Sequence, residues 1–202
     1  MLVEKMIKRL IDIAVSLMGI ILLSPLLIIL SIIIKSDSEG SAFFKQKRAG
    51  KDGKSFTIYK FRTMYSNTDS YARSPVDNND VRITEVGKML RKTSLDELPQ
   101  LFNVLMGDMS IVGPRPLLEC QAEEFNDFEK QRLIVKPGIT GLAQINGRGS
   151  LSWDKKMEYD VEYVNNRSLL FDIKIAFKTI GSIIKREDVY EDEEAGWEKW
   201  NT

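Results

Sequence analysis

Two adjacent carboxylates, Asp96 and Glu97, share one short segment with Arg115, and these residue types can act together on a phosphate group. Arg115 lies between two prolines, whose rings fix the backbone on both sides of a side chain that stays charged at physiological pH. A guanidinium held in this way suits phosphate oxygens, which it contacts through parallel N–H groups. Residues 93–116 are therefore the candidate active-site segment.

The same segment also has the pattern of a short helix with well-defined ends. Ser94 or Asp96 can cap it, Glu97 occupies the capping-box position, Pro99 is tolerated in the first turn, and Gly107 closes it. The expected buried stripe follows helical spacing and consists of Leu98, Leu101, Phe102 and Leu105. Capping accounts for these residue types, but it does not account for the arginine between prolines.

The composition limits the chemistry further. The chain has 202 residues, no histidine and one cysteine, Cys120, so it lacks the commonest general base and cannot form an intramolecular disulfide or a cysteine-rich zinc site. Any metal is expected to be a hard ion held by oxygen, and Mg²⁺ with carboxylates and substrate phosphate is the default. Lys plus Arg and Asp plus Glu are equal at 29 each, so no net charge favours nucleic acid, and we expect no such partner.

Residues 13–34 form an apolar run long enough to cross a hydrocarbon core of ~30 Å. A single membrane-spanning helix is the simplest interpretation. Ser24-Pro25 near its middle argues for a break, because proline lacks an N–H and its ring clashes with the preceding turn. Basic residues flank the run on both sides, which fits a helix that enters and leaves by the same cytoplasmic face. We favour this re-entrant arrangement slightly.

Beyond the apolar run, residues 55–64 alternate as a strand would, with Lys60 and Arg62 on one face. These two cations can meet lipid headgroups or a phosphorylated substrate, or they can simply lie at a solvated edge. Residues 66–80 have the composition of a loop. A helix expected over residues 82–91 would bring Arg91 close to the carboxylate pair.

The second half of the chain contains a loop dense in glycine and side-chain amides. Glycines allow backbone N–H groups to approach a phosphate or a base edge, although such a loop is a weak signal alone. Its candidate binding residues are Gly138, Thr140, Gly141, Gln144 and Arg148. Helices are expected over residues 117–133, 153–163 and 168–186. The last of these can lie in a membrane interface or pack on the core.

Several long motifs, in order, resemble the bacterial sugar transferases known as monotopic phosphoglycosyl transferases, over residues 5–185. They are Lys8-Arg9-Leu-Ile-Asp12, Ser24-Pro25, Lys60-Phe-Arg-Thr-Met64, Ser94-Leu-Asp-Glu-Leu-Pro-Gln-Leu-Phe-Asn-Val-Leu105, Gly107-Asp-Met-Ser-Ile-Val-Gly-Pro-Arg-Pro116 and Pro137-Gly-Ile-Thr-Gly141. The length resembles the minimal members of the family, which lack the additional membrane helices of larger relatives.

The resemblance implies transfer of a sugar 1-phosphate from a UDP-sugar to undecaprenyl phosphate at the cytoplasmic face of the bacterial inner membrane, with release of UMP. It implies that Asp96 is the nucleophile, that Glu97 acts beside it, and that Mg²⁺ binds at this acidic pair. An aspartate can form an acyl phosphate without help from a histidine. Arg115, Arg91 and Lys60 are then the candidates for holding phosphate oxygens. Asp160 and Asp172 also resemble acidic positions of the family, as metal ligands or as residues that position helices.

The expected fold is α+β and mostly helical. It comprises a re-entrant membrane helix broken at Ser24-Pro25 (residues 1–36), a catalytic domain (37–186) and an acidic tail (187–202), with inner-membrane lipids as a partner. The expected sugar is an N-acetylated amino sugar. Two alternatives stay open: a membrane-anchored phosphohydrolase with an aspartyl phosphate, and a membrane adaptor without turnover.

Overall fold

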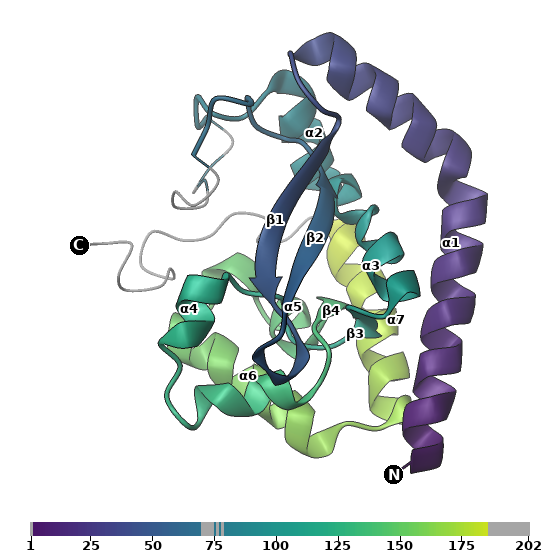
Figure 1. The fold of residues 1–202 in the computed structure, drawn as a ribbon, viewed down its shortest axis with the longest axis vertical. Coiled ribbons are helices and arrows are strands. Elements are labelled where there is room, and N and C mark those ends of the chain that lie inside the picture. Colours follow the sequence, from purple (N-terminus) through teal and green to yellow (C-terminus); the bar gives the residue numbers. More distant parts are fainter. Residues whose placement is uncertain (1, 70–74, 76, 78, 186–202) are drawn as a thin grey trace.

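The chain begins with one long helix, α1 (Leu2–Asp37), in a computed structural model that describes residues 2–69, 75, 77 and 79–185. The expected helix-break-helix is wrong in one respect, because the backbone stays helical through Pro25. Figure 1 shows how α1 curves along one side of the molecule and leans over its upper end. A proline removes one hydrogen bond and bends a helix without having to end it.

The first third of α1 is fastened to the globular part of the chain by polar side chains. Arg9 donates to the carbonyls of Val104 and Leu105 at 2.6 and 2.9 Å. Asp12 is buried and accepts hydrogen bonds from Ser110 Oγ and Ile111 N, at 3.1 and 2.9 Å. These bonds join α1 to the end of α3 (Gln100–Met106) and to β3 (Ser110–Val112).

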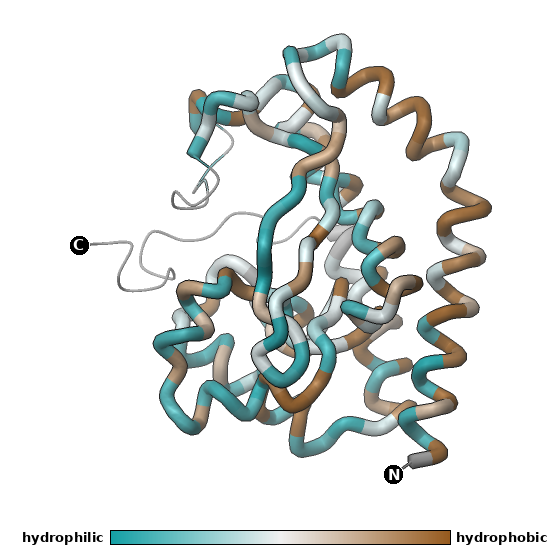
Figure 2. Tube along the Cα trace, viewed as in Figure 1, coloured by the Kyte–Doolittle hydropathy of each residue, from teal (hydrophilic) through white to brown (hydrophobic). Residues whose placement is uncertain are grey.

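The last third of α1 returns to the same globular part. Leu27, Leu30 and Ile34 are buried there in a cluster with Phe61 and Leu90. Both ends of the helix therefore contact one body of protein. Between and around these contacts α1 carries many exposed apolar side chains. Figure 2 shows hydrophobic residues, in brown, along most of its length.

Lys60 lies on β2 (Ser55–Phe61), which pairs with β1 (Phe43–Ala49) in a two-stranded antiparallel sheet. The predicted strand over residues 55–64 is confirmed for its first part. Its partner β1 was not predicted, because its charged sequence resembles a surface segment. A short turn, η1 (Lys51–Gly53), joins the two strands, with Asp52 at a φ of 56°.

Beneath Arg115, a short parallel pair joins β3 to β4 (Gly138–Thr140). Gly138 and Gly141 pack directly against the backbone of Gly113, and a Cβ on either would overlap it. These glycines allow two backbone segments to approach closely, and so fix the start of the Pro-Arg-Pro run.

The remaining elements are helical, so the expected mostly helical α+β class fits. They are α2 (Glu85–Thr93), η2 (Leu95–Glu97), α4 (Glu119–Glu123), η3 (Glu129–Ile134), α5 (Leu142–Ile145), η4 (Arg148–Ser150), α6 (Trp153–Asn166) and α7 (Leu169–Lys185). The single helix expected over residues 117–133 is wrong, because Asn126 interrupts it: its side-chain oxygen accepts from the N–H groups of Phe128 and Glu129. The acidic tail and part of the 66–80 loop lie outside the described residues.

Candidate active site

The two carboxylates lie on η2, a tight turn between α2 and α3. The expected cap, Ser94 or Asp96, is wrong, because Pro99 occupies the cap position of α3 and no side chain caps it. Ser94 instead ends α2 in the left-handed conformation, with a φ of 56°. A non-glycine residue rarely adopts this conformation. The chain therefore turns sharply immediately before Asp96, and this turn sets the direction of both carboxylates. Gly107 ends α3 as expected, at a φ of 97°.

The buried residues of α3 differ from the predicted stripe, because they are Gln100, Asn103 and Val104. Gln100 and Asn103 are buried, whereas Phe102 is 39% exposed. Leu98 and Leu101 contact α1, because Leu98 packs on the cluster around Leu30 and Leu101 lies against Gly19. The leucines thus face α1, while Asn103 and Val104 face the sheet, where Val104 packs with Phe56 and Ile58.

Glu97 is held by two cations. Lys60 Nζ and Arg115 Nη2 both donate to Glu97 Oε1, at 2.8 and 2.9 Å. Burial alone would raise the pKa of Glu97, but Arg115 and Lys60 together lower it well below its usual range. Glu97 therefore stays ionised, and it links β2 to the Pro-Arg-Pro run.

Asp96 is the less engaged carboxylate. Its nearest ion-pair contact is a long one, 3.9 Å from Oδ2 to Lys60 Nζ, and its side chain is only 14% exposed. Burial raises the pKa of Asp96, while Lys60, Arg91 and Arg115 oppose that rise. Burial also lowers the pKa of Lys60. Asp96 is thus a shielded, more basic carboxylate surrounded by cations.

Arg91 lies at the edge of this group and Arg62 lies outside it. Arg91 donates from Nε to Thr63 Oγ1 at 3.0 Å, and its charge acts on Asp96. Arg62 is buried and donates to the carbonyls of Ile34, Ser38 and Glu39. These bonds satisfy carbonyls at the C-terminal end of α1, a common use of arginine.

The residues predicted from the glycine-rich loop lie in the packing behind the site. Thr140 Oγ1 is 2.7 Å from Thr179 Oγ1 on α7, and Gln144 Nε2 donates to Ile139 O at 2.9 Å. Gly138 and Gly141 contact Gly113, as described above. The backbone of Arg148 begins η4, and its side chain is not described.

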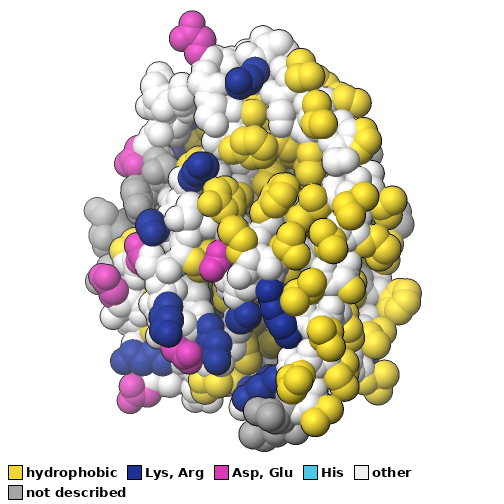
Figure 3. Space-filling view, turned by 45° about the vertical axis from the view of Figure 1, so that its right-hand side comes forward, with side chains coloured by type: hydrophobic (Ala, Val, Ile, Leu, Met, Phe, Trp, Pro, Cys, Tyr) yellow, Lys and Arg dark blue, Asp and Glu magenta, His cyan; other side chains and the backbone are white. Residues whose placement is uncertain are grey.

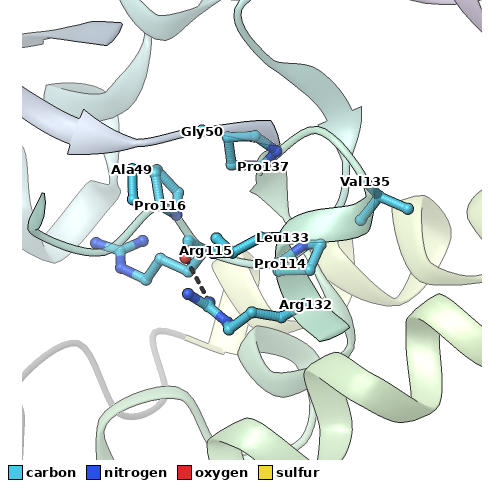
Figure 4. A pocket seen from close by; sticks show the side chains of 9 residues that line it. All are labelled: Ala49, Gly50, Pro114, Arg115, Pro116, Arg132, Leu133, Val135 and Pro137. Carbon is cyan, nitrogen blue, oxygen red and sulfur yellow. Dashed lines mark hydrogen bonds between the residues drawn. The ribbon is translucent and has the colours of Figure 1, made fainter. Parts of the chain in front are cut away.

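A shallow hollow lies behind Arg115 (Figure 4). It is lined by Ala49, Gly50, Pro114, Arg115, Pro116, Arg132, Leu133, Val135 and Pro137. In Figure 4 the Arg115 side chain extends away from Arg132, while its main-chain carbonyl meets the Arg132 guanidinium. Arg132 could not be singled out from its sequence context, because one arginine in a charged segment resembles a surface residue.

Asp160 and Asp172 each pair with a cation away from the dyad. Asp160 accepts from Arg132, and Asp172 accepts from Lys8 Nζ at 2.5 Å and from the Tyr163 hydroxyl at 2.7 Å. No group of three or more acidic, histidine or cysteine side chains suited to a metal occurs among the described residues. Both aspartates therefore join elements of the fold.

The sequence profile of the family described as "Bacterial sugar transferase" matches residues 3–186. The chain belongs to this family. Among its bacterial sugar transferase relatives, the "Uncharacterized sugar transferase EpsL" of Bacillus subtilis is 44% identical over 91% of this chain and 90% of its own length.

Two other relatives carry names that state a reaction. The "Undecaprenyl-phosphate galactose phosphotransferase" of Salmonella typhimurium is 42% identical over 93% of this chain and 42% of its own length. The "UDP-N-acetylgalactosamine-undecaprenyl-phosphate N-acetylgalactosaminephosphotransferase" of Aeromonas hydrophila is 43% identical over 88% and 44%, respectively. The chain thus spans nearly all of the EpsL protein and less than half of these two.

Proposed function

We propose that this bacterial sugar transferase moves a sugar 1-phosphate from a UDP-sugar to undecaprenyl phosphate and releases UMP. The observation that carries the proposal is the buried turn on which Asp96 and Glu97 meet Lys60 and Arg115. Cations around a shielded carboxylate suit an anionic diphosphate. The names of the Salmonella and Aeromonas relatives support the same reaction class.

We infer that the reaction proceeds by two displacements at one phosphorus. In the first, an Asp96 carboxylate oxygen bonds to the phosphorus that bears the sugar, and the bridging P–O bond breaks so that UMP leaves with the electron pair. In the second, an oxygen of undecaprenyl phosphate bonds to the same phosphorus, and the Asp96 carboxylate leaves. Asp96 suits this role because Glu97 Oε1 is already occupied by Lys60 and Arg115.

Asp96 and Glu97 can supply two of the oxygen ligands that Mg²⁺ requires. Mg²⁺ commonly takes one or two protein carboxylates and completes its shell with water and substrate phosphates. Asp96 makes only a long contact to Lys60, so it has oxygen available, and Glu97 stands beside it. When bound there, the ion would neutralise charge on the diphosphate. Lys60 and Arg115 hold Glu97 in place and add positive charge of their own.

The site is proposed to face the cytoplasm, where UDP-sugars are made, with α1 as a re-entrant element. Both ends of α1 contact the same globular part of the chain. A straight span would carry its two ends to opposite sides of the bilayer. A bent helix that dips into one leaflet keeps both ends on one side, and it brings η2 close to a lipid-borne acceptor.

Incubation with a UDP-sugar alone separates the covalent route from direct transfer. Without undecaprenyl phosphate, the protein should release UMP in an amount equal to the enzyme, and the peptide that contains Asp96 should gain the mass of a phosphosugar. Asp96→Asn should abolish both signals. UMP that appears only after the lipid acceptor is added, without any adduct, would show a ternary mechanism instead. Free sugar phosphate as the sole product would indicate a hydrolase. The absence of any turnover would indicate an adaptor.

We propose an N-acetylated amino sugar as the sugar transferred, in line with what the family resemblance implies for small members. The Salmonella relative is named for galactose and the Aeromonas relative for N-acetylgalactosamine, so these names do not decide between the two kinds of sugar and a direct assay is needed. A panel of UDP-sugars, assayed by UMP release in the presence of undecaprenyl phosphate, should show the highest kcat/KM for an N-acetylated one. A preference for UDP-glucose or UDP-galactose would overturn this choice.

A further inference from the structure

Four carbonyl oxygens hold the main chain around Arg115, together with the Gly113 N–H, which donates to Thr140 O at 2.9 Å. The two flanking prolines have no N–H, so carbonyls are the backbone groups that remain for hydrogen bonding. All four carbonyls accept hydrogen bonds from distant parts of the chain. Val112 O accepts from Lys8 Nζ and from the Tyr163 hydroxyl, at 3.1 Å each, and Pro114 O accepts from Gly138 N at 2.8 Å. Arg115 O accepts from Arg132 Nη2 at 2.7 Å, and Pro116 O accepts from Arg48 Nη1 at 3.4 Å.

Arg132 contacts the residue that matters most in this run. Its guanidinium is buried, lies over the Phe125 ring at 5.6 Å, and donates to Asp160 Oδ2 from Nε at 3.0 Å and from Nη2 at 2.6 Å. The same Nη2 reaches the Arg115 carbonyl. The Arg115 side chain extends the other way in Figure 4, and its Nη2 donates to Glu97 Oε1. One buried fork thus fixes the main chain from which the active-site guanidinium projects.

Packing alone does not explain this pair. Both side chains are only 3% exposed, and a buried ion pair is often no more stable than apolar residues of similar volume, because both charges lose their water. Asp160 Oδ1 is also buried and has no hydrogen-bond partner among the described residues, and burial raises the pKa of Asp160. The buried pair therefore adds little to the stability of the fold, but it does fix the main chain of Arg115.

We propose that Arg132 and Asp160 form a positioning pair for Arg115, which holds its main chain so that its guanidinium meets the sugar diphosphate. Neither residue touches the reacting atoms. The inference rests on the proposed function for the role of Arg115. It assigns to Asp160 a place in substrate binding that acts through Arg132.

The test replaces both charges together, so that no charge is left buried alone. Arg132→Met with Asp160→Leu should keep or raise the melting temperature. It should lower kcat/KM for the UDP-sugar about tenfold to a hundredfold, since small displacements of a binding group have effects of that order. The matched control, Lys155→Gln with Glu158→Gln, removes an exposed ion pair of 2.6 Å on the same helix and should leave kcat/KM unchanged.

The decisive arm repeats both pairs in an Arg115→Ala background, which keeps the Arg115 carbonyl but removes the guanidinium. If the pair acts through that guanidinium, the double replacement should cause no further loss there. Arg132→Lys should recover part of the activity, because a lysine can reach Asp160 or the carbonyl but lacks the fork that joins both. Wild-type kcat/KM in the double variant, or an equal loss with and without Arg115, would overturn the positioning role.

Hydrogen exchange distinguishes this failure from failure of the proposed function. The amides of residues 111–118 should exchange faster in the Arg132→Met, Asp160→Leu variant and at the wild-type rate in the control. Unchanged exchange in both would overturn the positioning role even if sugar phosphate is transferred. A wild-type protein that transfers no sugar phosphate would overturn the proposed function, while faster exchange would still support the role of the pair.

Discussion

At the scale of single residues, the dyad divides its work between one engaged and one available carboxylate. Glu97 Oε1 accepts hydrogen bonds from Lys60 and Arg115, whereas Asp96 makes only the long contact to Lys60. Two carboxylates on one turn thus have different pKa values because their surroundings differ. The difference comes from the cations, because Glu97 bonds both Lys60 and Arg115 whereas Asp96 bonds neither closely.

The raised pKa of Asp96 predicts a displaced acid limb in the pH profile. If Asp96 is the nucleophile, as proposed, it must be ionised, so kcat/KM should fall, as the pH drops, at a pH above the usual aspartate value of 3.8. Glu97→Gln removes a negative neighbour and should move the limb to lower pH, with slower turnover. Lys60→Met removes a positive neighbour and should move it to higher pH. Initial rates of UMP release across a pH series check both directions, and a limb that stays in place in both variants would contradict the assignment.

At the scale of elements, the site depends on how α3 docks on β2. Asn103 is fully buried, accepts from Tyr59 N at 3.0 Å and donates to Thr57 O at 2.7 Å. Its side chain therefore acts as a short strand partner along the free edge of β2. Since Tyr59 immediately precedes Lys60, this bond also sets the height of Lys60 relative to the dyad.

Asn103→Ala should leave the Tyr59 N–H and the Thr57 carbonyl buried without partners. The expected loss is about 2 kcal/mol in the free energy of unfolding, which is typical for unsatisfied buried groups. Asn103→Asp should keep the bond from Tyr59 N but place a buried carboxylate against Thr57 O and the Asp108 carboxylate, and so should be less stable than alanine. Urea unfolding in detergent measures the order. Equal stability of all three proteins would show that Asn103 does not couple α3 to β2.

Sequence patterns predicted the individual elements better than their relations. The residues of β2, α6 and α7 carried clear periodicity, and Gly107 ended α3 as expected. The side of α3 that faces the sheet was missed, because the leucines that suggested a buried stripe pack toward α1, while Asn103 and Val104 are buried against β2. Arg132 was missed for a related reason: its partner Asp160 lies far along the chain, and only the fold reveals that both are buried.

At the scale of the whole molecule, exposed apolar side chains are gathered rather than scattered. One described helix, α1, is long and apolar enough to cross a membrane, and only 11% of its apolar window is buried. Figure 3 shows hydrophobic side chains over this side of the protein, with lysines and arginines gathered lower on the same view. Helix α7 contributes an outward stripe at helical spacing, made of Leu170, Ile173, Phe177 and Ile180. A patch of this kind suits a lipid surface.

Accessibility labelling of the two ends of α1 tests how this surface meets the bilayer. Glu4 and Glu39 lie on either side of the apolar run, and each can be replaced by cysteine in a Cys120→Ser background. A re-entrant α1 places both on the cytoplasmic side, so a membrane-impermeant maleimide should label neither in intact cells and both after lysis.

Pro25→Leu restores the missing N–H and removes the ring clash, so the helix should straighten and lose its contacts at one end. The expected outcome is a fraction of molecules labelled at one of the two positions, together with lower UMP release, because Leu30 and Ile34 no longer pack beside α2 and the dyad turn. Ser31→Ala, a control on the same helix, removes only a side-chain bond to Leu27 O and should keep the wild-type pattern. Labelling of exactly one end in the wild-type protein would show a straight span, and the active site would then need a different route to its lipid acceptor.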